Sequence, residues 1–124
     1  MMKPTFPKAE RLKSRKEIAE LFESGDTFFK YPIKWISKKK VGSRSPTVKT
    51  GVTVSRRRWK RAVDRNRIKR LLREVYRLNK SEIVSTLSSD EHLNIMLLYV
   101  AQEELSFSEI EAAFLDLIDQ CLKT

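Results

Sequence analysis

The sequence has few of the residues from which catalytic and metal sites are built: one cysteine, one histidine and three glycines in 124 residues. The single Cys121 excludes an internal disulfide and a zinc site made of several cysteines, and it fits a reducing cytoplasm. The single His92 leaves no motif that pairs histidine with a nucleophile, and no glycine-rich phosphate loop occurs. We therefore predict a binding protein without an active site of its own. We assign no metal ligand, and the residues leave open whether the protein itself binds a metal ion.

Long apolar runs are also missing. No stretch is long enough to cross a membrane, and the start of the chain lacks the apolar segment of a signal peptide. Acidic residues are scarce in residues 1–80, which carry 25 basic and 7 acidic side chains, whereas residues 81–124 carry 1 and 9. The net charge of +10 is thus concentrated on one part of a chain whose length predicts a single domain, 1–124, that binds a polyanion.

The densest basic segment runs from Arg56 to Arg73, with ten cations and one acid. Apolar residues recur through it at helical spacing, as Ile68, Leu71, Leu72, Val75 and Leu78. The opposite face carries Asn66, Lys69, Arg70, Arg73 and Arg77, with Arg65 and Arg67 at its two edges. Glu74 is the only acid between Arg65 and Lys80, so the mixed charge pattern of a solvated helix is absent. This pattern favours nucleic acid over an anionic membrane, because the apolar face is needed for the core.

Apolar periodicity and turn residues predict the other elements. We expect a helix over 15–24, strands over 27–30, 33–38 and 49–55, the basic helix from about 60 to 79, a strand over 93–100 and a final helix from about 108. Residues 1–13 are predicted to be an extended basic arm, 39–47 a mobile basic loop and 81–92 a polar turn and loop. The order αβββαβα predicts an α+β fold, a two-layer α/β sandwich with one sheet.

Four local signals refine these predictions. Ser14 with Glu17, and Ser108 with Glu111, have the spacing of a helix capping box. Gly25 follows the first helix, where a glycine in the left-handed conformation often ends a helix. Gly51 interrupts a strand pattern, which indicates a close approach of another group to one strand face. Along the second strand, Ile33 and Trp35 are expected on one face and Lys34 and Ile36 on the other.

The residues alone leave the type of nucleic acid open. A cationic helix fits the major groove of DNA and equally the phosphates of a folded RNA. A sheet face beside the first helix, with Phe22 and the basic arm, suits single-stranded nucleic acid, although such aromatics also fit a protein core.

One run carries a specific family resemblance. From Lys60 to Glu74 the sequence KRAVDRNRIKRLLRE closely resembles the signature of the bacterial ribonuclease P protein subunit. Phe6-Pro7 with Arg11-Leu12-Lys13 resembles the arm of that family, Leu21-Phe22 with Gly25 its first helix, and the segment 51–57 its third strand and basic turn. The resemblance implies a ribosomal S5 domain 2-like fold with a left-handed βαβ crossover.

The resemblance also implies a function and two surfaces. The protein would be a subunit of an RNA-based endonuclease that removes the 5′ leader of precursor tRNA, with Mg²⁺ bound mainly by the RNA. Its partners would be the catalytic RNA and the leader, with no membrane and no DNA. The implied surface for the catalytic RNA comprises Arg56, Arg57, Lys60, Arg61, Arg65, Asn66, Arg67, Lys69, Arg70 and Arg73. The implied leader cleft comprises Arg11, Phe22, Ile36 and Ser55.

Some positions depart from the family pattern. Ile18 and Ile36 stand where many members carry aromatic residues, so we expect apolar packing and Arg11 to carry more of the leader contact than base stacking does. The alternative function is an RNA-binding protein of another ribonucleoprotein, such as a ribosomal protein. A DNA-binding module comes third, and an independent nuclease last.

Overall fold

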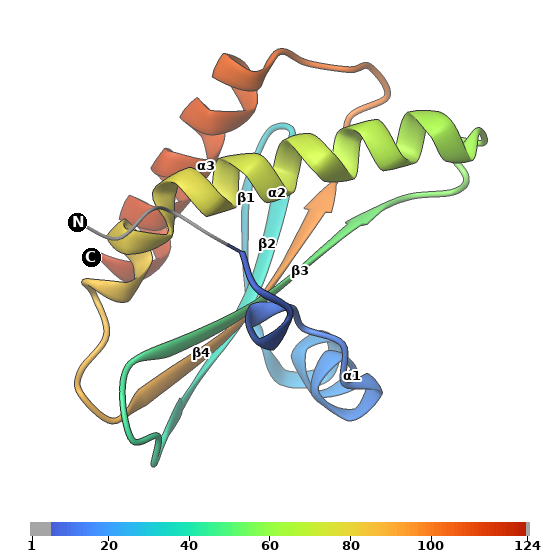
Figure 1. Ribbon diagram of the computed structural model, residues 1–124. Coiled ribbons are helices and arrows are strands. Elements are labelled where there is room, and N and C mark those ends of the chain that lie inside the picture. Colours follow the sequence, from blue (N-terminus) through green and yellow to red (C-terminus); the bar gives the residue numbers. More distant parts are fainter. Residues whose placement is uncertain (1–5, 124) are drawn as a thin grey trace.

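The predicted element order is confirmed. The computed structural model describes residues 6–123 (Figure 1). After a short 3₁₀ turn, Lys8–Glu10, the elements are α1 (Arg15–Ser24), β1 (Asp26–Lys30), β2 (Ile33–Val41), β3 (Thr47–Val54), α2 (Ala62–Val84), β4 (Glu91–Tyr99) and α3 (Phe107–Leu122). Residues 1–5 of the predicted arm lie outside the described residues.

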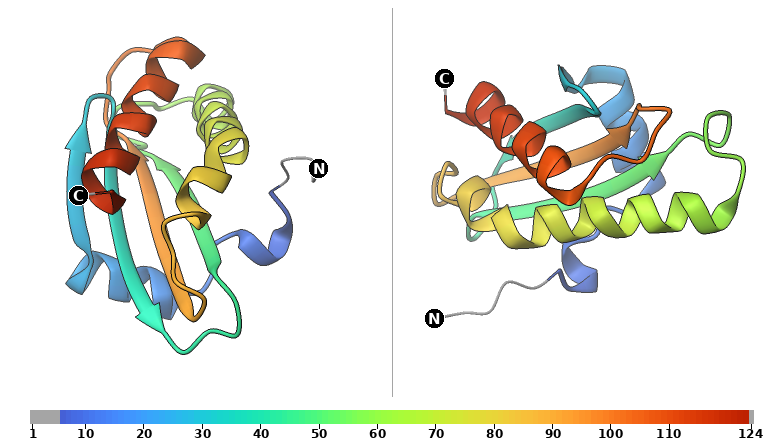
Figure 2. Two further views of the ribbon diagram at one scale, coloured as in Figure 1. Left: turned by 90° about the vertical axis from the view of Figure 1, so that its left-hand side faces the viewer. Right: turned by 90° about the horizontal axis from the view of Figure 1, so that it is seen from above.

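The four strands form one mixed sheet in the order β1-β2-β4-β3. The β1–β2 and β2–β4 pairs are antiparallel, whereas β3 and β4 are parallel. Helices α2 and α3 cover one face of the sheet and α1 crosses the other (Figures 1 and 2). In the upper half of Figure 1, where β3 and β4 point upward beneath α2, β4 lies to the left of β3, so the β3–α2–β4 connection is a left-handed crossover. General handedness rules would not predict this connection.

Two groups of buried side chains hold these layers together. The larger group fills the space between the sheet and helices α2 and α3, and the rings of Trp35 and Phe114 meet there with centroids 5.7 Å apart. The smaller group lies under α1 and contains Leu12, Leu21, Ile36 and Met96. Strand β2 therefore supplies Trp35 to one face and Ile36 to the other, as its alternation predicted.

Several predicted boundaries were wrong. Strand β2 continues to Val41, because residues 39–41, predicted as loop, pair with residues 91–93 of β4. Helix α2 begins at Ala62 and continues past the predicted end near residue 79 to Val84, because Ile83 extends its buried stripe into the segment predicted as a polar turn and loop. These differences arise from pairing and packing partners that are distant in sequence.

The capping box of α3 lies two residues earlier than predicted. Ser106 Oγ accepts a hydrogen bond from the Glu109 backbone N–H at 3.2 Å, and Glu109 Oε1 accepts one from the Ser106 N–H at 3.3 Å. Glu111, predicted as the capping glutamate, instead accepts a hydrogen bond from Asn79 Nδ2 of α2 at 3.0 Å. Its carboxylate joins α3 to α2.

Gly25 is required for space and not for an unusual backbone conformation. Its φ of −76° and ψ of 157° are extended, so the predicted left-handed cap is wrong. A Cβ atom at this position would lie 2.5 Å from the Leu21 carbonyl oxygen and 2.8 Å from Ile36 Cγ2. Gly51 is also closely approached, as predicted, with Met96 Cε 2.9 Å from the equivalent point.

The two glycines are expected to differ in their response to alanine. Gly25→Ala should lower the free energy of unfolding by about 1–3 kcal/mol, since backbone at the end of α1 must shift. Gly51→Ala should cost less, because the obstructing atoms are the flexible end of Met96. Chemical denaturation of both variants measures the difference, and equal losses would contradict this account of Gly25.

Candidate nucleic-acid interface

The segment 55–61 between β3 and α2, here called the basic loop, presents five exposed cations, which are Arg56, Arg57, Arg58, Lys60 and Arg61. The loop is held to the body of the protein. The Trp59 backbone N–H donates to the Ser55 carbonyl at 3.0 Å, and its indole Nε1–H donates to the Ala101 carbonyl at 2.9 Å. The Trp59 ring also meets Tyr99 edge-on, with centroids 6.3 Å apart, and the Arg58 guanidinium donates to the Val100 carbonyl. Fixed backbone thus supports the exposed cations.

The two arginines of the Arg65-Asn66-Arg67 run lie at the two edges of α2, as the helical spacing predicted. Arg65 Nη1 donates to the carbonyls of Trp59, at 2.7 Å, and Lys60, at 2.9 Å, so this side chain reaches back to the basic loop. Arg67 lies on the other edge. Its Nε donates to Glu104 Oε1 at 2.5 Å and its Nη2 to Asp64 Oδ1 at 3.0 Å. Hydrogen bonding to Glu104, and then the charge of that carboxylate, raises the pKa of Arg67.

The remaining polar face of α2 adds cations to those of the loop. Asn66 and Arg70 are exposed and Lys69 is half-buried. Together with the basic loop they form a continuous run of chain whose exposed positions are mainly cationic. Such a surface attracts the closely spaced phosphates of a nucleic acid.

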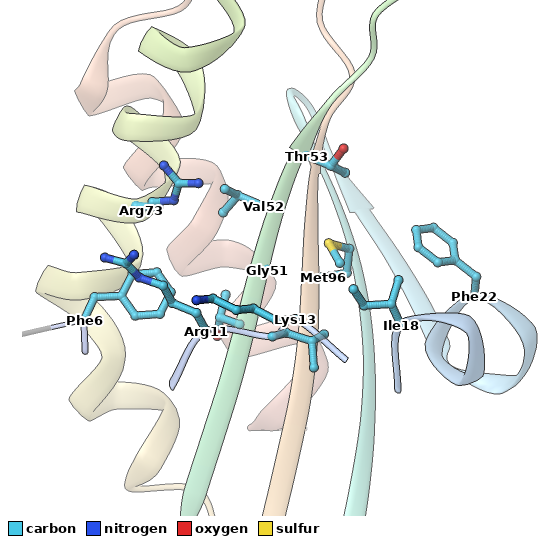
Figure 3. Close-up of a pocket in the computed structure, with 12 residues that line it drawn as sticks. Phe6, Arg11, Lys13, Ile18, Phe22, Gly51, Val52, Thr53, Arg73 and Met96 are labelled. Atoms are coloured by element: carbon cyan, nitrogen blue, oxygen red, sulfur yellow. The ribbon is translucent and has the colours of Figure 1, made fainter. Parts of the chain in front are cut away.

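A groove of about 440 Å³ lies between the arm, β3 and α1 (Figure 3). Its lining includes Arg11, Lys13, Phe22, Thr53, Arg73 and Met96. In Figure 3 the arm and α2 supply the cations on one side, and Phe22 and Ile18 stand on α1 at the other. The groove thus combines positive charge with an exposed aromatic ring, the two features that suit single-stranded nucleic acid.

The arm wall of the groove is built on the edge of β3. Arg11 forms a parallel bridge with Thr50, and the Leu12 N–H donates to the Thr50 carbonyl at 3.0 Å. The Arg11 guanidinium lies 5.5 Å from the centre of the Phe6 ring, and Phe6 packs on Tyr76 with centroids 4.8 Å apart. This stack fixes the direction of the Arg11 side chain.

Arg73 was assigned from sequence to the surface for the catalytic RNA, but it lines the groove. Burial, and secondly the positive charge of Arg11, lower the pKa of Arg73. Two guanidiniums that repel each other across a groove wall favour an anion between them.

The structure brings together two of the four residues assigned to the cleft. Arg11 and Phe22 line the groove. Ile36 is 4% exposed and lies beneath it in the buried group under α1, while Ser55 lies beyond the end of β3 in the basic loop. Sequence reasoning missed Lys13 and Thr53. Thr53 could have been found from strand alternation, because it shares a strand face with Gly51.

His92 lies on β4 and not in a polar loop, so its predicted location was wrong. Its Nδ1 lies 2.5 Å from Thr47 Oγ1 and its Nε2 lies 2.6 Å from Asn94 Oδ1. The buried Asn94 donates in turn to Glu17 Oε2 at 3.1 Å, and this hydrogen bond is the main cause that lowers the pKa of Glu17. The histidine thus belongs to a polar network that ties α1 to the sheet.

Residues 6–123 contain no group of three or more His, Cys, Asp or Glu side chains that could hold a metal ion. Nor does any helix in this part of the chain combine the length and apolar character needed to span a membrane. The left-handed α+β fold, the cationic loop and helix, and the cation-lined groove define a nucleic-acid-binding protein.

Comparisons with known proteins identify its family. The family model described as Ribonuclease P matches residues 6–122. The ribonuclease P protein component of Porphyromonas gingivalis strain W83 is 37% identical over 113 residues, which cover 89% of this chain and 82% of that protein. The corresponding protein of Geotalea uraniireducens is 33% identical over 120 residues, which cover 95% of this chain and 96% of that protein. The chain belongs to the bacterial ribonuclease P protein family.

Solved structures agree on the fold. The RNase P protein of Staphylococcus aureus superposes with a TM-score of 0.66 at 18% identity, covering 94% of this chain and all of that one. The RNase P protein of Thermotoga maritima gives a TM-score of 0.64 at 22% identity, and the superposition covers 90% of this chain and 96% of that one. These likenesses show the fold alone. The family match and the relatives in sequence make this chain a protein subunit of ribonuclease P, the endoribonuclease that processes the 5′ leader of precursor tRNA.

Proposed function

We propose that two adjacent surfaces of this subunit divide the work of RNA binding. The basic loop and the exposed polar face of α2 dock on the catalytic RNA, and the groove between the arm, β3 and α1 holds the single-stranded 5′ leader. The observation that carries this division is the position of Arg73. Arg73 places a cation of α2 on the wall of the groove, and none of the exposed cations of the basic loop lines that groove.

Docking on the catalytic RNA is supported by charge and by rigidity. The loop backbone is anchored through Trp59, so its exposed cations meet a phosphate array without first becoming ordered. Lys69 and Arg70 extend the same surface along α2. Neutralising phosphates in this way reduces their mutual repulsion in the folded RNA.

Leader binding is supported by the composition of the groove. Arg11, Lys13 and Arg73 provide charge for the phosphates, and Phe22, 53% exposed, provides an apolar face for a base. Mature tRNA lacks the leader, so contacts in this groove favour the precursor. Ile36 supports the floor from below, and Ser55 belongs with the docking loop.

Mg²⁺ is proposed to be held mainly by the phosphates of the catalytic RNA, which would perform the hydrolysis. Among residues 6–123 no cluster of carboxylates, histidines or cysteines fits a protein-held ion. The protein would therefore act by binding and orienting RNA. We place this activity in the cytoplasm, where a free thiol such as Cys121 stays reduced.

Cleavage of precursor tRNA at low Mg²⁺ tests the proposal. Three samples are compared: the protein alone, the cognate catalytic RNA alone, and both together. Cleavage by the mixture only, at the 5′ end of the mature tRNA, with tighter binding of precursor than of mature tRNA, is the expected result. Stimulation without any preference for precursor would overturn the leader-groove assignment and leave the docking assignment standing.

The Glu104–Arg67 pair gives a second test of the docking surface. Glu104→Gln should raise the affinity for the catalytic RNA by about two- to fivefold, because it frees Arg67 from a carboxylate that competes with phosphate. Filter binding at several salt concentrations measures this change. Asp119→Asn removes the same charge near the other end of α3 and is the control. An equal gain in both variants would mean that net charge, and not Arg67, sets the affinity.

A further inference from the structure

The junction between the basic loop and α2 lacks the usual helix-capping contact. Arg61 occupies the N-cap position and its side chain makes no capping hydrogen bond. N-cap side chains normally satisfy a free backbone group and fix the angle at which the chain enters the helix. Some other contact must hold the loop against the first turn of α2.

Arg65 supplies that contact. One nitrogen, Nη1, donates to two successive carbonyls of the loop, those of Trp59 and Lys60. Charge-assisted hydrogen bonds of this kind are roughly twice as strong as neutral ones. The side chain is half-buried, whereas Arg56, Arg57, Lys60 and Arg61 are exposed. Arg65 therefore differs from the neighbouring cations both in its burial and in its hydrogen bonds to the loop backbone.

We propose that Arg65 is a positioning residue, which fixes the basic loop through the Trp59 and Lys60 carbonyls so that the exposed loop cations match the phosphates of the catalytic RNA. The inference rests on the proposed docking function. It reassigns the first arginine of the Arg65-Asn66-Arg67 run from phosphate contact to organisation of the loop. Trp59 also holds the loop in place, because its indole N–H donates a hydrogen bond to the Ala101 carbonyl.

Hydrogen exchange of the free protein tests this role without RNA. Arg65→Gln should accelerate amide exchange over residues 56–61 by roughly tenfold or more, since two charge-assisted hydrogen bonds are lost. The matched control is Arg70→Gln, an exposed arginine later on the same helix, which should leave exchange in the loop unchanged. Circular dichroism of both variants verifies that the fold is retained. Unchanged loop exchange in Arg65→Gln would overturn the proposal.

The salt dependence of binding to the catalytic RNA provides the second readout. Arg70→Gln should lower the slope of log K against log salt by about one, as loss of one phosphate contact does. Arg65→Gln should lower the slope by about two or more, because several loop cations would no longer lie opposite the phosphates of the catalytic RNA. Equal slopes for the two variants would mean that Arg65 is an ordinary phosphate contact. No effect of Arg70→Gln on binding would instead contradict the docking surface itself.

An uncharged residue gives the sharpest control. Trp59→Phe removes the indole N–H that bonds to Ala101 and changes no charge. The proposal expects faster exchange in the loop and at least a severalfold weaker affinity for the catalytic RNA. Faster exchange with unchanged affinity would show that loop position does not matter for binding, and the proposal would fail.

Discussion

Replacing four of the five exposed cations of the basic loop with glutamine, and leaving Arg58 on the Val100 carbonyl, is expected to lower the affinity for the catalytic RNA by roughly 200- to 1,000-fold at 0.15 M salt. The four residues are Arg56, Arg57, Lys60 and Arg61. Each phosphate contact contributes about 0.7 to 0.9 to the slope of log K against log salt, so the slope should also fall by about 2.8 to 3.6. A salt series with the purified catalytic RNA measures both quantities.

A second fourfold variant separates position from total charge. Lys30, Lys39, Arg44 and Lys123 are exposed cations outside the basic loop, α2 and the groove. Their replacement by glutamine removes the same charge, and we expect a much smaller loss of affinity, because long-range attraction is screened within about 8 Å at this salt concentration. Similar losses in the two variants would refute a defined docking surface and indicate binding by net charge alone.

Much of the fold follows from short-range patterns in the sequence. Helix α1 was predicted with its observed ends, because Ser14 and the apolar stripe mark them locally, and Ser14 Oγ accepts from the Glu17 N–H at 3.2 Å. The errors occur where two local signals compete. Ser106 and Ser108 are each followed three residues later by a glutamate, and the contact between Glu111 and Asn79 of α2 removes the second glutamate from capping. Only tertiary structure resolves such a choice.

The candidate site shows a similar limit. A helical wheel correctly separated Arg65 and Arg67 onto two edges of α2, but it could not reveal what lies opposite each edge. Glu104, the partner of Arg67, is 37 residues away in sequence, and the groove beside Arg73 exists because the arm pairs with β3 through Thr50. The cationic character of the surface was therefore predictable, and the division of roles among its arginines was not.

Phe22→Ala is expected to reduce the preference for precursor over mature tRNA by roughly 5- to 150-fold. Stacking of a base on an aromatic side chain contributes about 1–3 kcal/mol, and mature tRNA has no leader base to lose. Phe22 projects from α1 toward the groove and is 53% exposed, so its loss should leave the core intact. Equilibrium binding of both tRNAs to the assembled ribonucleoprotein measures the ratio, and circular dichroism verifies the fold.

Phe29 on β1 is the matched control, since it is an aromatic residue with a similar exposure of 56% and it does not line the groove. Phe29→Ala should leave the precursor preference unchanged. Loss of preference in both variants would indicate a general change in the protein. If Phe22→Ala retains the full preference while Arg11→Gln and Arg73→Gln reduce it, the leader is held by its phosphates. The apolar side of the groove would then serve chiefly to keep α1 on the sheet, through Leu21 and Ile36.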